Sequence, residues 1–143
     1  MRSKKIEAIM RLPGHQRYAH TIKQAWDEGG VWSIRDDAGW LCVGDEHENM
    51  YMPLWPHESY AELYRLDGWQ DKHSEKISMS ELLKKWCVEL KRDGYKVCVF
   101  PTSTDGGVAV CPERLKKDLL EYGSELAFDD IELEELVEEL TSI

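Results

Sequence analysis

The hydrophobic positions of the first 28 residues repeat at the spacing of an α-helix. In a short segment over residues 4–10 the hydrophobic residues lie on one side of the expected helix, and the Leu-Pro-Gly sequence at 12–14 breaks the pattern. From His15 a second stripe follows the i, i+4, i+7, i+8 rule for one buried helix face, at Tyr18, Ile22, Ala25 and Trp26. Gly29-Gly30 ends this stripe, so the chain is predicted to begin with two helices.

Three β-rich runs follow, over residues 31–35, 40–43 and 50–54. An Asp-Ala-Gly sequence separates the first two runs, and a polar loop over 44–49 separates the second from the third. Connections this short favour antiparallel neighbours. The three runs are therefore predicted to form a three-stranded antiparallel meander.

The middle of the chain reads as two helices joined by a polar connection. The first is expected over 56–66, because proline suits a first helical turn and apolar side chains then share one side, at Tyr60, Ala61 and Tyr64. The polar connection covers residues 67–76. Ser78 then begins a capping box with Glu81, ahead of a helix that Gly94 stops.

A hairpin and two further helices are predicted for the rest of the chain. Apolar runs over 95–100 and 108–111 flank a glycine-containing turn. Pro112 opens a helix that Gly123 is expected to stop. Asp129 or Asp130 caps a last, acidic helix, in which an apolar stripe lies at Leu133, Leu136, Val137 and Leu140.

The order of these elements predicts an α+β fold. A mostly antiparallel sheet of about five strands, the three-stranded meander plus the hairpin, packs with helices. Residues 1–122 are expected to form a single domain, and residues 123–143 an acidic C-terminal helical extension. No βαβ alternation of the dinucleotide-binding kind and no internal repeat is present in the sequence.

Charge is unevenly distributed along the 143 residues, whose net charge is −10. From Gly123 to the end there is no Lys or Arg, and the acids are Glu125, Asp129, Asp130, Glu132, Glu134, Glu135, Glu138 and Glu139. Nucleic-acid binders normally present a basic face, because phosphate neutralisation supplies much of their affinity. Nucleic acid is therefore not the expected partner, whereas a basic protein is.

Composition argues for a folded protein of the cytoplasm. Hydrophobic residues make up 42% of the chain, yet apolar runs are only a few residues long, so no membrane span is predicted. The N-terminus has no apolar stretch of signal-peptide length, which favours a reducing cytosol and free cysteines. The four cysteines lack the close spacing of a zinc site, and we expect no metal and no cofactor.

Several segments occur in an order and spacing that resemble a known bacterial family. They are VWSIRDDAGW from residue 31, MPLWPHESYAELY from 52, ISMSELLKKW from 77, KVCVFP from 96 and VAVCPERLKKDL from 108. Together they resemble the domain of unknown function 2750 family over residues 15–122, with the acidic end as an extension. The layout is also similar, more loosely, to SseB-like domains. The resemblance supports the fold outline and implies no established activity or catalytic residue.

No catalytic motif for a nucleophile, a phosphate loop or a metalloprotease is present, so no catalytic residue is assigned. Aromatic residues instead cluster between positions 32 and 69. Most are expected in the core, and Trp55 between two prolines is expected to fill the corner where a strand ends and a helix begins. The alternative is a groove rimmed by Trp32, Trp40, Trp55 and Tyr60.

Two hypotheses of function follow. The first is a non-enzymatic, cytosolic protein-interaction domain that binds a basic partner, as an immunity protein binds a cationic toxin. The acidic side chains expected to carry that contact are Glu132, Glu135, Glu138 and Glu139. The second is a small-molecule or peptide pocket lined by the four aromatic residues. The acidic helix has an alternative to docking on a partner: its apolar stripe packs on its own domain.

Overall fold

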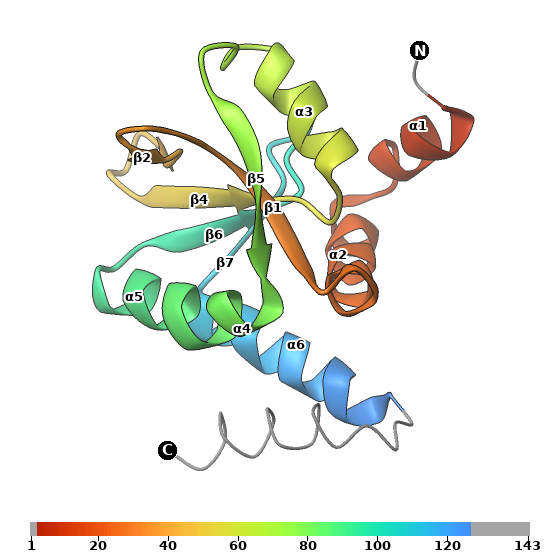
Figure 1. Ribbon diagram of the computed structural model, residues 1–143, viewed down its shortest axis with the longest axis vertical. Coiled ribbons are helices and arrows are strands. Elements are labelled where there is room, and N and C mark those ends of the chain that lie inside the picture. Colours follow the sequence, from red (N-terminus) through yellow and green to blue (C-terminus); the bar gives the residue numbers. More distant parts are fainter. Residues whose placement is uncertain (1–2, 127–143) are drawn as a thin grey trace.

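Two small sheets meet at the centre of the computed structural model, which describes residues 3–126 (Figure 1). The first is antiparallel, in the order β2-β1-β5, with β1 at Gly30–Asp36, β2 at Gly39–Trp40 and β5 at His73–Ser78. The second has the order β3-β4-β6-β7, with β3 at Val43–Gly44, β4 at Met50–Leu54, β6 at Lys96–Val99 and β7 at Val108–Val110. Trp32 and Trp55 join the sheets by exchanging two backbone hydrogen bonds of 2.8 Å.

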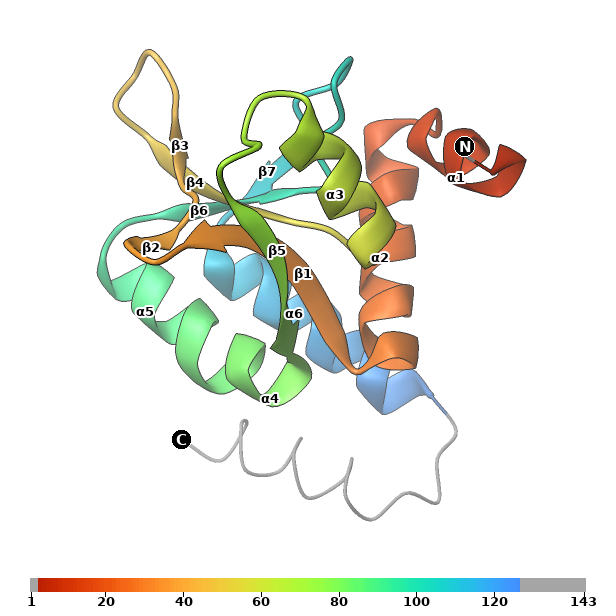
Figure 2. The ribbon, with the colours of Figure 1, turned by 45° about the horizontal axis from the view of Figure 1, so that its top comes forward.

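Helices cover both ends of this sheet pair. They are α1 (Lys4–Met10), α2 (Gly14–Glu28), α3 (Glu58–Leu66), α4 (Met79–Glu81), α5 (Cys87–Arg92) and α6 (Pro112–Glu125), with a π-helical turn, Leu82–Trp86, between α4 and α5. Figure 1 shows α3 at one end of the sheets and α4, α5 and α6 at the other. Figure 2 shows α6 between α5 and α2, in agreement with its contacts to both.

The expected helix boundaries are confirmed at two positions. Gly29 ends α2 in the left-handed conformation, and its N–H donates to the carbonyl of Ala25. The Ser78 hydroxyl accepts a 3.1 Å hydrogen bond from the Glu81 N–H and so caps α4. The helix expected from Pro56 begins two residues later, as α3 at Glu58, where the His57 side chain caps it by accepting from the Ser59 N–H.

The α+β class and the β6–β7 hairpin are confirmed, but the strand pairing differs from the expected meander. The chain leaves the first sheet after Trp40 and enters the second at Val43, so β2 and β3 belong to different sheets. In addition, β4 and β6 pair in parallel. The hydrophobic pattern identified these strands correctly, but it carries no information on which strand each one pairs with.

The structure also contains a strand that the sequence pattern missed. Residues 67–76 were expected to be a polar connection, yet β5 begins at His73 and pairs with β1 from Gly30 to Arg35. Of its six residues only Ile77 is buried. Because backbone pairing with β1 holds this edge strand, its side chains need no alternation of apolar and polar residues.

Gly123 was expected to stop α6, but the helix continues to Glu125. A Cβ atom at Gly123 would lie 2.5 Å from Cζ2 of Trp26 on α2. The indole Nε1 of Trp26 donates a 2.9 Å hydrogen bond to the Leu119 carbonyl. Glycine at position 123 therefore allows α2 and α6 to approach closely instead of ending the helix. The predicted acidic helix falls in residues 127–143, outside the described residues.

Candidate functional site

The loop that joins β6 to β7 carries an unusual backbone conformation at its first residue. Phe100 has φ 57°, the left-handed region, which bulky side chains rarely adopt. The residue is fully buried, and its N–H donates a 2.7 Å hydrogen bond to the Leu54 carbonyl at the end of β4. Such a conformation costs on the order of 1–3 kcal/mol and persists only where surrounding contacts impose it. Strained residues of this kind concentrate at functional sites.

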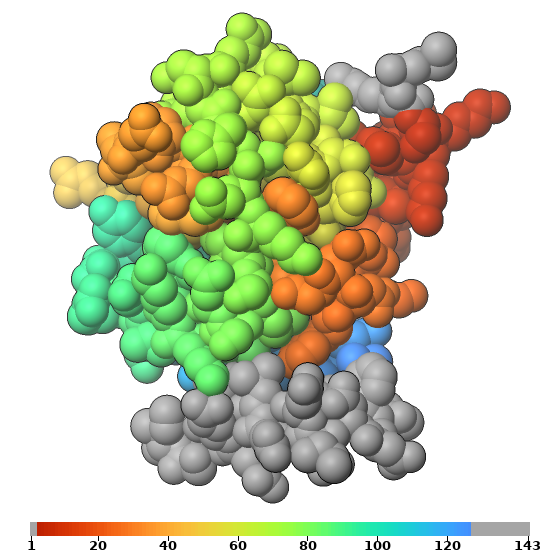
Figure 3. All heavy atoms as spheres, viewed as in Figure 1, coloured from red at the N-terminus to blue at the C-terminus, as the bar shows by residue number. Residues whose placement is uncertain are grey.

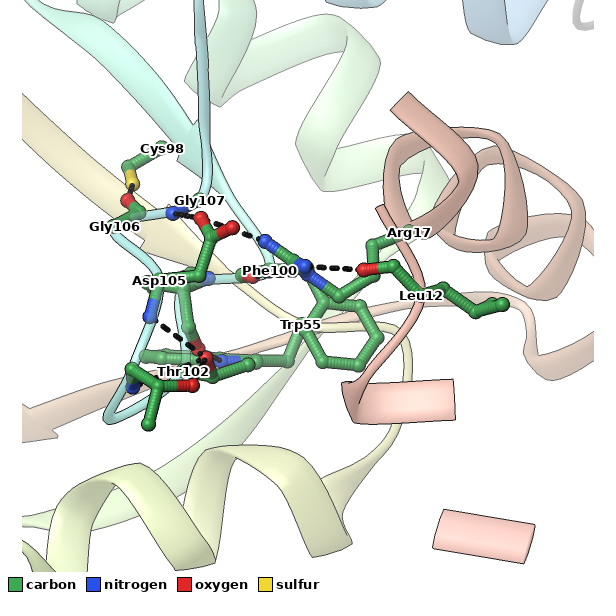
Figure 4. A network of polar contacts seen from close by, with 11 residues as sticks. Leu12, Arg17, Trp55, Cys98, Phe100, Thr102, Asp105, Gly106 and Gly107 are labelled. Atoms are coloured by element: carbon green, nitrogen blue, oxygen red, sulfur yellow. Dashed lines mark hydrogen bonds and ion pairs between the residues drawn. The ribbon is translucent and has the colours of Figure 1, made fainter. Parts of the chain in front are cut away.

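Arg17 of α2 supplies several of those contacts, as Figure 4 shows. Its side chain is 2% exposed, and Nε donates to the Phe100 carbonyl at 3.2 Å while Nη1 donates to the Leu12 carbonyl at 2.6 Å. Nη2 lies 2.8 Å from Oδ1 of Asp105, but not in line for a hydrogen bond, so this contact is an ion pair without an aligned N–H. The guanidinium also lies 5.8 Å from the centre of the Phe100 ring.

The rest of the loop is pinned by bonds within it. The Asp105 N–H donates to the Thr102 hydroxyl at 3.1 Å, and the Gly107 N–H donates to Oδ1 of Asp105 at 2.9 Å. The hydrogen bond from Gly107, followed by the contact with Arg17, lowers the pKa of the Asp105 carboxyl. Trp55 holds the loop from inside, because its Nε1 donates to the Pro101 carbonyl at 2.8 Å. Hydrogen bonds therefore hold the loop both from within and from the core.

A pocket of about 320 Å³ opens between this loop, α3 and the end of α1. Its walls combine apolar and aromatic side chains with hydroxyls, one carboxylate and other polar groups, so that polar and apolar surface are about equal. The residues are Met10, Tyr60, Leu63, Tyr64, Leu66, Asp67, Phe100, Pro101, Thr102 and Ser103. Leu66 is 52% exposed. The pocket lies beyond the carboxyl ends of the parallel strands β4 and β6, where ligands bind in many α/β sheets.

A second hollow of about 150 Å³ continues the pocket along α1. The two hollows share Met10, Thr102 and Ser103, and the second adds Glu7, Arg11 and Thr104. We name the joined hollows the α1–α3 groove. Figure 3 shows α1, in red, projecting at the edge of the molecule next to α3.

Two tyrosines line the floor of the groove. The Tyr60 ring packs 4.6 Å from that of Phe100, and the Tyr64 ring packs 5.1 Å from that of Trp55. Burial raises the pKa of both phenols. Both hydroxyls therefore stay protonated at neutral pH and can donate or accept a hydrogen bond.

The four aromatic residues expected to rim a groove occupy different environments. Trp55 is fully buried and fills the corner between β4 and α3, which agrees with the corner interpretation. Trp32 is half-buried beside it, and Tyr60 lines the α1–α3 groove. Trp40 packs edge-on against Trp86 at 5.5 Å and under Arg35. The structure thus brings Trp32 and Trp55 together and places Trp40 in a different cluster.

Sequence reasoning missed Arg17 and Phe100. Arg17 occupies the buried face of α2 together with Thr21 and Ala25, at i, i+4 and i+8. A search for apolar stripes passes over an arginine, although the spacing itself was a usable signal.

The turn expected at the Asp-Gly-Gly sequence is confirmed as the β6–β7 loop. The acidic residues expected to bind a partner, Glu132, Glu135, Glu138 and Glu139, lie outside the described residues.

The thiols and titratable side chains of the described residues bear on catalytic and metal chemistry. Across residues 3–126, no group of three or more His, Cys, Asp or Glu side chains is placed to hold a metal ion. The four cysteines are free thiols. Burial raises the pKa of Cys87 to about 12 and that of Cys98 to about 11, so neither is a thiolate at neutral pH. The Cys98 thiol donates to the Gly106 carbonyl and belongs to the loop structure.

A comparison with models of known protein families gives a match. The model of a family described as "Protein of unknown function (DUF2750)" matches residues 18–119. No curated protein and no solved structure matches the chain. Within the part of the chain that the structure describes, none of the helices has the length and apolar character needed to cross a membrane.

Proposed function

The chain belongs to the DUF2750 family of proteins of unknown function, and we propose that it is a non-enzymatic protein-interaction domain. In this proposal the α1–α3 groove receives an extended segment of a basic partner protein. An immunity-like role, in which the partner is a cationic toxin, is one version. The cytoplasm remains the predicted location.

The shape of the groove is the observation that carries the proposal. Two adjoining hollows, of about 320 Å³ and 150 Å³, share Met10, Thr102 and Ser103 and so continue into each other beside α1 and the loop. A compact metabolite is usually enclosed on most of its surface, whereas an extended peptide needs a continuous trough with a pocket for one anchoring side chain. The larger hollow fits an aliphatic or aromatic anchor, because Leu66, Tyr64 and Phe100 line it.

Charge supports a basic partner. The groove is lined by the carboxylates of Asp67 and Glu7 against the single base Arg11, in a chain whose net charge is −10. A strongly acidic protein attracts cationic partners over a distance of about a Debye length, an effect that added salt weakens. We therefore expect the bound segment to combine one large apolar side chain with neighbouring Lys or Arg.

A small-molecule pocket is the second candidate function. It is favoured by the volume of the larger hollow, which falls within the range of about 300–1,000 Å³ typical of ligand sites. The phenols of Tyr60 and Tyr64 and the hydroxyls of Thr102 and Ser103 are suitable for orienting a polar ligand.

Selection from a random peptide library displayed on phage tests the first candidate directly. The selected peptides should share an apolar residue flanked by Lys or Arg, and a synthetic copy should bind the protein with an affinity that falls as salt rises. Leu66→Asp should weaken this binding at least about tenfold, because it puts a charge on the apolar wall of the groove. Ala38→Asp, at an exposed position of the β1–β2 turn that lines none of these hollows, adds the same charge and is the control that should bind normally.

Failure to enrich any peptide family, or equal binding by Leu66→Asp and the wild type, would contradict the interaction proposal. A metabolite screen read by tryptophan fluorescence distinguishes the second candidate, since Trp55 lies directly behind Tyr64. A saturable change that is lost in Leu66→Asp, in the absence of peptide binding, would favour a small-molecule site.

A further inference from the structure

A second groove lies on the opposite end of the molecule, between α5 and α6. It encloses about 530 Å³ and is more apolar than the α1–α3 groove. The residues that line it are Cys87, Val88, Lys91, Pro112, Glu113, Lys116, Lys117, Leu120 and Glu121. Val88 stands 49% exposed on the α5 side. An aliphatic side chain exposed in a preformed apolar groove is typical of a surface that another segment covers.

The sequence provides a segment of matching character. The described chain ends at Leu126, immediately after α6, and residues 127–143 follow. They carry an apolar stripe at i, i+3, i+4 and i+7, at Leu133, Leu136, Val137 and Leu140. A stripe of this kind must be buried against something for such a helix to be stable in water.

The length of residues 127–143, and the point at which they leave α6, would allow them to reach the groove between α5 and α6 of the same chain. Residues 127–130 contain two aspartates and are long enough for the short connection that joins antiparallel helices. A helix from residue 131 to 143 would be about 20 Å long, close to the length of about 21 Å that the 14 residues of α6 occupy. Folding back along α6 would bring Leu136 near Leu120, in the middle of the groove.

The charges of the two surfaces are complementary. The groove presents Lys91, Lys116 and Lys117, together with Glu113 and a Glu121 that already lies 3.9 Å from Lys117. Residues 127–143 hold seven acids and no base. On a helical projection Glu132 and Glu139 lie along one edge of the apolar stripe and Glu134 along the other, where the rim lysines can meet them.

We infer that residues 131–143 dock into the α5–α6 groove of the same chain as an amphipathic helix. The apolar stripe covers Val88 and Leu120, and flanking acids pair with the rim lysines. In this arrangement Glu135 and Glu138 lie on the outer side and remain accessible. The α5–α6 groove is then part of the domain's own packing, whereas the α1–α3 groove stays open to a partner.

Hydrogen exchange of the full chain, followed by mass spectrometry, tests the inference. Amides of residues 131–143 should exchange at least about tenfold more slowly than in an unstructured chain. Leu136→Asp, in the stripe, and Val88→Asp, in the groove, should each remove this protection. Ser142→Asp adds the same charge on the opposite side of the expected helix and should preserve it, as should Leu66→Asp.

Three results would overturn the inference. One is exchange of residues 131–143 at the rate of an unstructured chain. Another is protection that survives Val88→Asp, which would show that the helix forms without the groove. The third is protection that disappears on dilution, which would show that the segment docks into a second copy of the chain instead.

Discussion

Arg17 holds Phe100 in two ways at once. The Nε atom of Arg17 donates to the Phe100 carbonyl at 3.2 Å, and the guanidinium lies 5.8 Å from the centre of the Phe100 ring. Phe100 adopts a left-handed backbone conformation and forms part of the floor of the α1–α3 groove. A buried cation from the first long helix therefore fixes the shape of a surface formed 83 residues later.

Replacing Arg17 by methionine should destabilise the protein by about 3 kcal/mol. The substitution keeps most of the side-chain volume but leaves the carbonyls of Leu12 and Phe100 without their donor and Asp105 without its cation. Urea unfolding, monitored by tryptophan fluorescence, measures the change. Asp105→Asn should have a smaller effect, because that carboxylate is 47% exposed and water can replace its partner. Equal effects of the two substitutions would contradict the role assigned to Arg17.

The helices and most strands of this protein can be predicted from its sequence, whereas the pairing of the strands cannot. The apolar patterns identified the helices of the described residues and five strand-forming runs, because burial of one face produces a regular spacing of hydrophobic residues. One of these runs, residues 40–43, was expected to be a single strand but is divided between β2 and β3. The apolar patterns missed β5, whose backbone pairing with β1 does not require such a pattern. Sheet order and the parallel β4–β6 pair depend on contacts between distant segments, which spacing along the chain does not record.

The candidate site was harder to predict than the fold. Tyr60 was identified because aromatic residues are common in binding surfaces, and it does line the α1–α3 groove. Arg17 was not identified, because a charged residue within an apolar stripe looks like a polar interruption until its partners are known. Those partners are backbone carbonyls, and the sequence gives no sign of where a carbonyl will lie.

Gly123→Ala should destabilise the protein by about 1–3 kcal/mol, although alanine normally favours a helix. The added Cβ would lie 2.5 Å from Cζ2 of Trp26, so α2 and α6 would have to separate. Thermal unfolding measures the loss. Ser124→Ala, at the neighbouring exposed position of the same helix, is the control and should change stability by no more than about 0.5 kcal/mol. A stabilising Gly123→Ala would show that the close approach of the two helices is not required.

Stability should fall on acidification, in part through Glu62. Its carboxylate accepts two hydrogen bonds from Arg65 and one from Ser74, and the contact with Arg65 is the main reason that the pKa of Glu62 lies below its usual 4.5. A carboxyl whose pKa is lower in the folded state stabilises that state above the unfolded pKa. The stabilisation is lost as pH falls below about 4.5 towards the folded pKa.

Glu62→Gln should therefore reduce stability at pH 7 and make the difference from the wild type shrink as pH falls below 4.5. Urea unfolding at a series of pH values between about 7 and 3 measures both effects. The exposed Glu46→Gln serves as the control for removal of one charge. Parallel stability curves for wild type and Glu62→Gln across this range would refute the assignment.

Trp55→Phe should cost about 1–3 kcal/mol, more than the loss of ring area alone would explain. The indole is fully buried, and its Nε1 donates a 2.8 Å hydrogen bond to the Pro101 carbonyl, which phenylalanine cannot replace. The loop over the α1–α3 groove should loosen at the same time, so amides of residues 101–105 should exchange faster in the folded protein. Trp40→Phe is the matched control, because Trp40 is half-buried and packs against Trp86, away from the loop. If Trp40→Phe loosened the loop as much as Trp55→Phe did, the exchange would report general destabilisation, and the specific link from Trp55 to Pro101 would have to be abandoned.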